Sequence, residues 1–206
     1  NDTISNYFFD IHFYNDQYYI IGTHYTNLWY LVLNKNLEIL HENTFGIPPD
    51  SWFSYLNSII DSDSNIVITG YTTRWDTHPN GDTIPNRDVF FYKLSNEGDS
   101  ITSKFYRTAN ALTMSFDIIE KPDSSGYFAY GFKYSADLPY AGQRFELGKE
   151  MDSIFVDTIP YGLYSYCSLE ILDDSSILIC GRGRDHEVFG EYSLNVLSTT
   201  IDNHAI

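Results

Sequence analysis

The sequence is poor in basic residues. Lys and Arg together number 12 of 206 residues against 28 Asp and Glu, which leaves a formal net charge of −16. Without a basic stripe the chain has nothing to replace the counterions of a nucleic acid, and anionic lipid surfaces repel it. We therefore expect no nucleic-acid partner. The charge itself indicates solubility in an extracellular setting, or a preference for cations such as calcium.

Long apolar runs and helical periodicity are also missing. No run approaches the ~20 residues needed to span a bilayer, so we expect no membrane insertion. No window repeats apolar residues at the spacing of a helix face, so helix should be minimal. The chain starts at Asn1 without an initiator Met or the apolar core of a signal peptide, which predicts a processed or trimmed product and is compatible with a removed export signal.

Cysteine is scarce, with Cys167 and Cys180 alone. Both fall on the two strands of one expected hairpin. If Leu172 pairs with Ser175, the two cysteines face each other, and a disulfide would indicate an oxidising compartment. A four-residue loop would leave them diagonal. Two small buried thiols are the alternative, and the sequence leaves both open.

Aromatic residues are abundant, with 18 Tyr and 14 Phe, and they belong to an internal repeat. Four β-rich runs each end in a glycine, and an aromatic residue stands fifteen positions before each glycine. The pairs are Tyr7 and Gly22, Tyr55 and Gly70, Phe116 and Gly131, and Tyr166 and Gly181. A polar turn lies between the members of each pair, so each copy begins with a hairpin.

A third and a fourth strand follow in each copy, including 187–195 and 196–202 in the last one. The copies run approximately over 7–46, 54–108, 114–160 and 165–203, with glycine spacings of 48, 61 and 50. Four strands at a period of about fifty residues is typical of β-propeller blades. We therefore predict an all-β, single-domain chain over residues 1–206, a β-propeller of four blade-like repeats. Whether four repeats close a ring, or form part of a larger propeller, stays open.

The second copy resembles a known family of repeats. It contains Ile68-Thr69-Gly70-Tyr71-Thr72, then Asp88-Val89-Phe90, then Lys93-Leu94 and the turn Asn96-Glu97-Gly98-Asp99. These motifs are similar to the SBBP-type β-propeller repeats of secreted bacterial proteins, which are common in Bacteroidetes. The resemblance implies export and either binding or surface display, and it brings no catalytic residues with it.

The connection between the second and third strands varies most in length, as specificity loops do on a rigid scaffold. The longest insertion, residues 71–87, places Trp75 beside charged residues, a pattern typical of sugar- or peptide-binding loops. The candidate ligand-binding residues are Arg74, Trp75, His78, Tyr134, Tyr140, Arg182 and Arg184. Alternatively, Trp75 covers the sheet edge and the last two arginines pair with Asp185 and Glu187.

Two metal sites are conceivable. Asp61, Asp63 and Asn65 have the spacing that opens a calcium loop, although no glycine or later glutamate completes it. The same cluster is an ordinary hairpin turn. His24, His78 and His186 fall in three variable loops and could bind zinc or iron, but no ligand spacing supports this, and solvated loop histidines are the favoured account.

The function that these patterns favour is a secreted or cell-surface module, non-enzymatic, that binds a protein or polysaccharide on the face of the variable loops. One alternative is a carbohydrate-active hydrolase or lyase that uses carboxylates such as Asp76, Asp82, Asp88 and Asp185. A second alternative is a purely architectural part of an adhesin. No catalytic residue can be assigned from the sequence, and calcium is the one cofactor that a motif suggests.

Overall fold

The computed structural model describes residues 6–46, 51–77, 83–108, 111–135, 141–159, 165–173, 176–184 and 192–200. These residues form strands and turns without a helix among them, so the all-β class is confirmed. Over the same ranges no helix is present that could cross a lipid bilayer. The chain divides into two compact units, Asn1–Asn110 and Ala111–Ile206.

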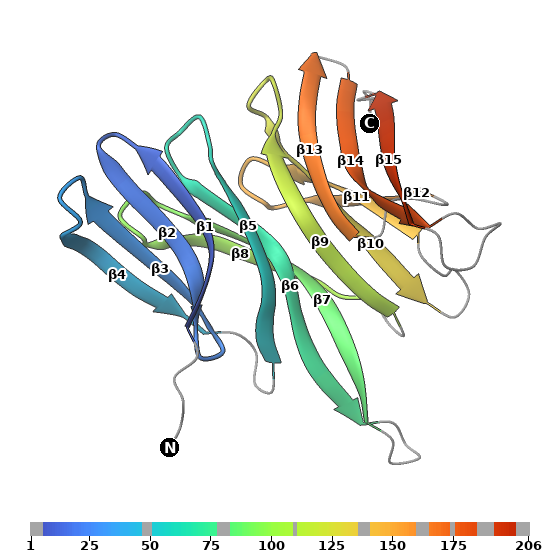
Figure 1. Cartoon of the computed structure of the whole chain (residues 1–206), viewed down its shortest axis with the longest axis horizontal. Helices are drawn as coiled ribbons and strands as arrows, with labels where there is room; N and C mark the ends of the chain where they lie inside the picture. The colour runs from blue at the N-terminus through green and yellow to red at the C-terminus, as the bar shows by residue number, and fades with distance from the viewer. Residues whose placement is uncertain are drawn as a thin grey trace. The chain divides into compact units, whose positions relative to one another are not determined.

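The first unit consists of two antiparallel meanders, whose strands pair in chain order (Figure 1). The first meander contains β1 (Asn6–Tyr14), β2 (Gln17–His24), β3 (Asn27–Asn34) and β4 (Ile39–Phe45). The second contains β5 (Ser51–Ile60), β6 (Ile66–Thr77), β7 (Thr83–Leu94) and β8 (Ser100–Tyr106). The expected polar turns lie between the paired strands.

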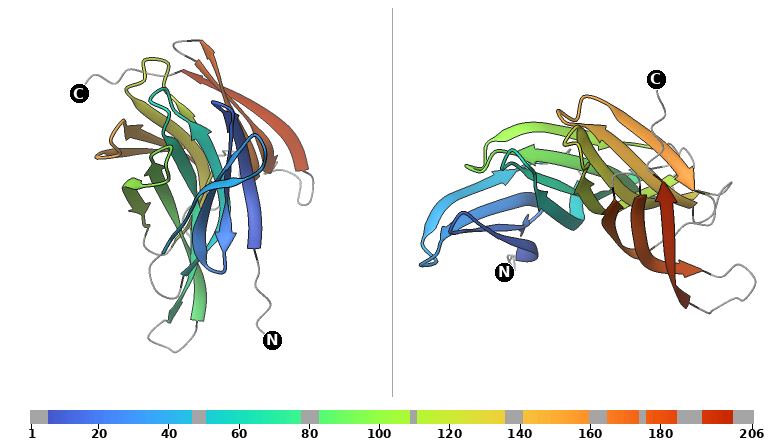
Figure 2. Two further views of the ribbon diagram at one scale, coloured as in Figure 1. Left: turned by 90° about the vertical axis from the view of Figure 1, so that its left-hand side faces the viewer. Right: turned by 90° about the horizontal axis from the view of Figure 1, so that it is seen from above.

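The second unit follows the same plan. One meander contains β9 (Ala111–Glu120), β10 (Gly126–Ser135), β11 (Ala141–Gly148) and β12 (Ile154–Ile159). The other contains β13 (Ser165–Asp173), β14 (Ser176–Arg184) and β15 (Tyr192–Thr200). Figure 2 shows the twist of these strands from two further sides. Such a twist is the ordinary consequence of L-residue stereochemistry.

The predicted β-propeller is wrong. In the strand order, β5–β8 and β9–β12 belong to one open eight-stranded sheet, in addition to open sheets of four strands (β1–β4) and three (β13–β15), rather than to four separate four-stranded blades. Residues 192–200 are also one continuous strand, paired with β14 from Ser176–Thr200 to Arg184–Tyr192, where we expected a turn between a third and a fourth strand. The sequence pattern predicts which strands pair within a meander. It does not predict what the edge strand of a meander pairs with, because the N–H and C=O groups on that edge can bond to any other strand. The arrangement of the meanders therefore could not be predicted from the pattern.

The repeated glycines have a structural cause. In the hairpin of β1 and β2, a Cβ on Gly22 would lie 2.3 Å from the carbonyl oxygen of Tyr7. At Gly70 the corresponding distance to the Tyr55 oxygen is 1.9 Å. The first strand of each hairpin carries a bulge near this point, which turns its backbone toward the second strand. In these two hairpins the fifteen-residue spacing therefore marks a close backbone approach that only glycine permits, whereas at Gly131 the near carbonyl is that of Met114, seventeen residues earlier.

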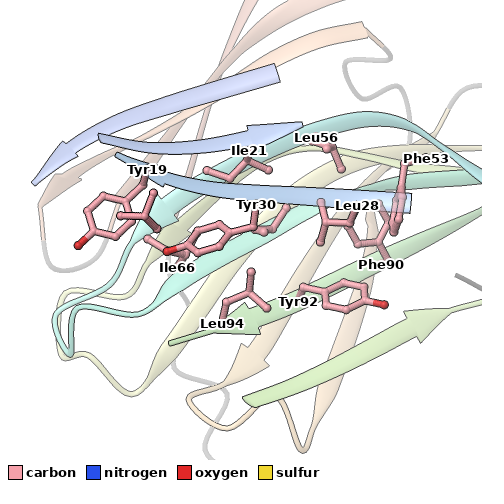
Figure 3. Packing of buried hydrophobic residues seen from close by; sticks show 12 residues of the cluster. Tyr19, Ile21, Leu28, Tyr30, Phe53, Leu56, Ile66, Phe90, Tyr92 and Leu94 are labelled. Atoms are coloured by element: carbon pink, nitrogen blue, oxygen red, sulfur yellow. The ribbon is translucent and has the colours of Figure 1, made fainter. Parts of the chain in front are cut away.

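The core of the first unit lies between its two sheets (Figure 3). One face of the β1–β4 sheet, which we call its front face, contributes Tyr19, Ile21, Leu28, Tyr30 and Val32. The facing side of the β5–β8 sheet, its back face, contributes Phe53, Leu56, Ile66, Ile68, Phe90, Tyr92 and Leu94. These side chains are at most 6% exposed, so the apolar contact between the two faces stabilises the unit.

A carboxylate joins the first strands of the two stacked sheets. Oδ2 of Asp10 on β1 accepts hydrogen bonds from the backbone N–H of Ser58 on β5 (2.9 Å) and from its hydroxyl (2.7 Å). The second unit repeats this bond, because Oδ2 of Asp117 on β9 accepts from the N–H of Leu169 on β13 (2.6 Å). Asp10 is paired with Ile21 and Asp117 with Tyr130, each one residue before a repeat glycine.

Stability should fall in acid partly because of Asp10. Burial alone would raise the pKa of this carboxyl, but the hydrogen bonds with His12 and Ser58 outweigh burial, and the pKa lies below 3.8. A group whose pKa is lowered by folding stabilises the protein above its unfolded pKa and loses that contribution as the pH falls through the folded value. The contribution of Asp10 is therefore complete above about pH 5 and declines below pH 4.

Asp10→Asn should cost about 1 kcal/mol at pH 7 and flatten the decline between pH 5 and pH 3. Urea unfolding at several pH values measures both effects. Ser58→Ala, which keeps the carboxylate and removes one donor, should give a smaller change of the same sign. An unchanged slope in Asp10→Asn would show that other carboxylates carry the acid sensitivity.

Candidate functional site

Four aromatic side chains and one arginine gather on the face of β5–β7 that points away from the unit's core. We call this set, Trp52, Tyr55, Tyr71, Trp75 and Arg87, the aromatic strip. Register places them together, since Tyr55 pairs with Tyr71, and Trp52 and Arg87 both pair with Thr73. Side chains two apart on a strand share a face, so Tyr71 and Trp75 lie on one side of β6.

One part of the strip is a ladder across three strands. The rings of Tyr55 and Tyr71 are parallel within 3° at a centroid distance of 6.5 Å. The guanidinium carbon of Arg87 lies 5.1 Å from the centroid of the Tyr71 ring. Stacking and the cation–π contact hold these side chains in place and keep the arginine charge near the strip. The ladder thus combines directional hydrogen-bonding groups with one positive charge.

The other part of the strip is a pair of indoles. The rings of Trp52 and Trp75 lie 6.2 Å apart, tilted by 42°. Trp75 is 53% exposed, whereas Trp52 is half-buried. Next to them the hydroxyls of Ser54 and Thr73 are hydrogen-bonded at 2.9 Å. An exposed indole braced by a second one presents a flat apolar plane to solvent, with polar groups beside it.

The predicted insertion is a longer hairpin rather than a loop. β6 continues to Thr77 and β7 resumes at Thr83, and the two strands stay paired to those residues. Arg74 and Trp75 therefore point to opposite faces of the sheet, as neighbours on a strand must. The register thus separates this arginine from Trp75, and Arg87 lies over the ring of Tyr71 instead.

Arg74 takes part in an ion cluster. Its Nε lies 3.3 Å from Oδ2 of Asp88, and Nε of Arg107 lies 3.1 Å from the same oxygen. Asp88 is 1% exposed. Two guanidinium groups around one buried carboxylate offset the cost of burying its charge, so this cluster stabilises the sheet.

Of the carboxylates considered for hydrolysis, Asp88 is thus part of an ion pair, whereas Asp82 and Asp185 lie outside the described residues.

The other predicted ligand-binding residues are distributed as follows. Tyr134 lies on β10 of the second unit and is 40% exposed. Arg182 and Arg184 belong to strand β14 rather than to a loop, and their side chains lie outside the described part. His78 and Tyr140 lie outside the described residues altogether. Of the two candidates described in the first unit, Trp75 belongs to the aromatic strip and Arg74 does not.

The suggested calcium loop forms a tight turn. Oδ1 of Asp61 accepts hydrogen bonds from the N–H groups of Asp63 (3.0 Å) and Asn65 (2.7 Å), and its Oδ2 lies 3.5 Å from Nζ of Lys93. In the next repeat the same two places hold Lys121 and Glu146, 2.5 Å apart, so the signs are exchanged. The turn position is acidic in one repeat and basic in the next, and its partner on the strand changes to the opposite charge. This exchange indicates an ion pair between turn and strand rather than a cation site.

The remaining metal and thiol predictions have partial answers. Over the described residues no group of three or more His, Cys, Asp or Glu side chains is arranged to hold a metal ion. His24 packs against Tyr25, and His186 lies outside those residues.

Cys180 is a free thiol whose backbone pairs with Ser168, so the hairpin register does not place Cys167 opposite it.

Sequence reasoning did not find Trp52, Tyr55, Tyr71 and Arg87 as one site. Part of the signal was present in the register: once Tyr55 pairs with Tyr71, alternation along β6 and β7 brings Tyr71, Trp75 and Arg87 to one face. Trp52 reaches that face only through the bulge between Phe53 and Tyr55, which alternation does not predict. Tyr55 was instead interpreted only as the aromatic residue of the repeat.

No protein-family model matches the chain, and no curated protein sequence matches it either.

Proposed function

We propose that this protein is a non-enzymatic, secreted or cell-surface binding module that holds an extended polysaccharide on the aromatic strip. The observation that carries the proposal is the grouping of Trp75, Trp52 and the Tyr55–Tyr71–Arg87 ladder on one sheet face. Sugar rings present apolar C–H faces that pack on indoles, and their hydroxyls need directional donors and acceptors. The strip offers both kinds of group.

The spacing favours a chain over a single sugar. Tyr71 and Trp75 are four residues apart on β6, which corresponds to about 13 Å along a strand. A ligand that contacts both ends of the strip must therefore span several sugar rings. The solvent-exposed end of this face is at Trp75, which is 53% exposed, because Thr69, Val89 and Phe91 on the same face are 0% exposed. The ligand should therefore contact the Trp75 end first.

The test is binding of the purified chain to a polysaccharide panel that contains β-glucan, xylan, mannan and pectin. We expect one class to be bound, and Trp75→Ala to weaken that binding about tenfold, since one stacked ring contributes about 1–2 kcal/mol. Isothermal titration with soluble oligosaccharides of that class gives the affinity. Arg87→Met, which keeps the length of the side chain and removes its charge, should weaken binding through lost hydrogen bonds.

The matched control is Phe155→Ala. Phe155 lies on β12, is 54% exposed and is not part of the aromatic strip. Its replacement should leave affinity unchanged while removing an aromatic ring with a similar exposed fraction. Equal losses in both variants, or no binding to any member of the panel, would contradict the proposal.

A further inference from the structure

The two faces of the β1–β4 sheet have very different surroundings. Its front face is covered by the β5–β8 sheet, as described above. Its other face, the back face, carries Phe8, Ile11 and Phe13 on β1, which are 63%, 59% and 60% exposed. Phe8 packs on Trp29 at 5.2 Å, and Phe13 packs on Tyr18 at 4.9 Å. The same face holds Glu42, which pairs with Leu31 and accepts a hydrogen bond from the Trp29 indole N–H (2.9 Å). Exposed aromatic and aliphatic side chains gathered on one sheet face indicate a contact with another protein surface.

The internal repeat identifies what normally covers a back face. Aligning Gly22 with Gly70 and Leu33 with Leu94 matches each back-face position of β1–β4 with one of β5–β8. The matched pairs are Phe8 and Leu56, Tyr18 and Ile66, Ile20 and Ile68, Trp29 and Phe90, Leu31 and Tyr92, and Leu33 and Leu94. In the β5–β8 sheet all six positions are buried beneath the front face of β1–β4.

The second unit shows the same arrangement. On the three-stranded sheet, aligning Gly181 with Gly70 matches Ile177 and Ile179 with the back-face residues Ile66 and Ile68, and Leu169 pairs with Ile179. Leu169, Ile177 and Ile179 are 6%, 1% and 1% exposed. β13 lies against β9 and β10 of the preceding meander. In two independent cases, therefore, a back face of this repeat is covered by the front face of another sheet.

We propose that the back face of β1–β4 is a docking surface for a further four-stranded sheet of the same repeat type, which presents its front face. Stacked repeats bury a continuous core, and a terminal repeat that ends such a stack needs a polar outer face. The back face of β1–β4 carries aromatic and aliphatic side chains at all six matched positions. Its chemistry is that of an internal repeat.

The docking sheet should also present a carboxylate to β1. Asp10 and Asp117 each bind a backbone N–H of the next sheet's first strand, at Ser58 and Leu169. Ser58 is paired with Ile68 and Leu169 with Ile179, and the residue at this place on β1 is Ile11, which is paired with Ile20. The N–H of Ile11 donates to Oδ1 of Asp10 in its own strand (2.8 Å), so an Asp of the partner sheet would share this donor with Asp10.

The experiment extends the chain by one repeat. Residues 1–50 are fused directly ahead of Thr3, which aligns with Ser51 through the Tyr7 and Tyr55 positions, so the added connection has the length of the existing one. We expect the melting temperature to rise by about 5 °C or more, since a new apolar interface is formed. Phe8→Asp in the original repeat should remove this rise while changing the unextended chain little.

Ile21→Asp in the added repeat should abolish the rise as well, because that side chain belongs to the docking front face. Asp10→Asn in the added repeat should reduce it. An extended chain that melts no higher than the original would overturn the proposal. So would reversible dimerisation of the unextended chain in analytical ultracentrifugation that Phe8→Asp abolishes, since a second copy would then be the natural occupant.

Discussion

Gly70→Ala should lower the free energy of unfolding by about 2–3 kcal/mol, with a fall in melting temperature of roughly 5–10 °C. The added Cβ would lie 1.9 Å from the carbonyl oxygen of Tyr55 and 3.0 Å from the ring of Phe90. The first obstacle is backbone, which a rotamer change cannot move, so the strands must separate at the bulge. Thermal and urea unfolding measure the loss.

Gly46→Ala is the control for this prediction. A Cβ at Gly46 would meet its nearest atom, a side-chain oxygen of Asn27, at 3.9 Å, an ordinary contact. Its backbone is not in the left-handed region, so the substitution should leave stability nearly unchanged or raise it slightly by restricting the unfolded chain. If both variants were equally stable, the hairpin would relax around a Cβ at Gly70, and close backbone approach would not explain the repeated glycine.

Asp61→Ala should be the most damaging single change, with a loss of about 3–5 kcal/mol. Asp61 is 4% exposed and Lys93 is 3% exposed, so the substitution leaves a buried ammonium group without its nearest counter-charge. It also removes the acceptor of the N–H groups of Asp63 and Asn65. Both effects act on the unfolding equilibrium, and denaturant titration reports their sum.

Two further variants separate these effects. Asp61→Asn keeps an oxygen for the turn and removes the charge, so its cost reports the ion pair. Combining Asp61→Ala with Lys93→Met removes both charges and should recover part of the loss, because a buried charge whose Asp61 partner has been removed is then absent. If the cluster were instead a calcium site, calcium would raise the melting temperature of the wild type and Asp61→Asn would abolish the rise.

The proposed binding function and the proposed docking surface use different faces of the first unit. The aromatic strip lies on the β5–β8 sheet, on the side away from the core, and the docking surface lies on the back face of β1–β4. Trp75→Ala should therefore leave the effect of the added repeat intact, and Phe8→Asp should leave polysaccharide affinity intact. Each experiment can fail without affecting the other.

The sequence by itself determined the strands and their hairpins. The pairs of aromatic residue and glycine at Tyr7 and Gly22 and at Tyr55 and Gly70, with polar turns between them, located hairpins that the structure contains. These features are local, because turn chemistry and side-chain alternation act over a few residues. The same reasoning failed at residues 193–195, where a turn was expected and β15 continues.

The tertiary structure alone decided how the sheets are arranged and which side chains meet. A strand pattern is equally consistent with blades around an axis and with open sheets, because the contacts that differ join residues far apart in the chain. Arg74 and Trp75 are neighbours in sequence, yet strand pleating sends one to Asp88 and the other to Trp52. Pairing across β5, β6 and β7 assembled the aromatic strip, and register over such distances is set by packing rather than by local propensity.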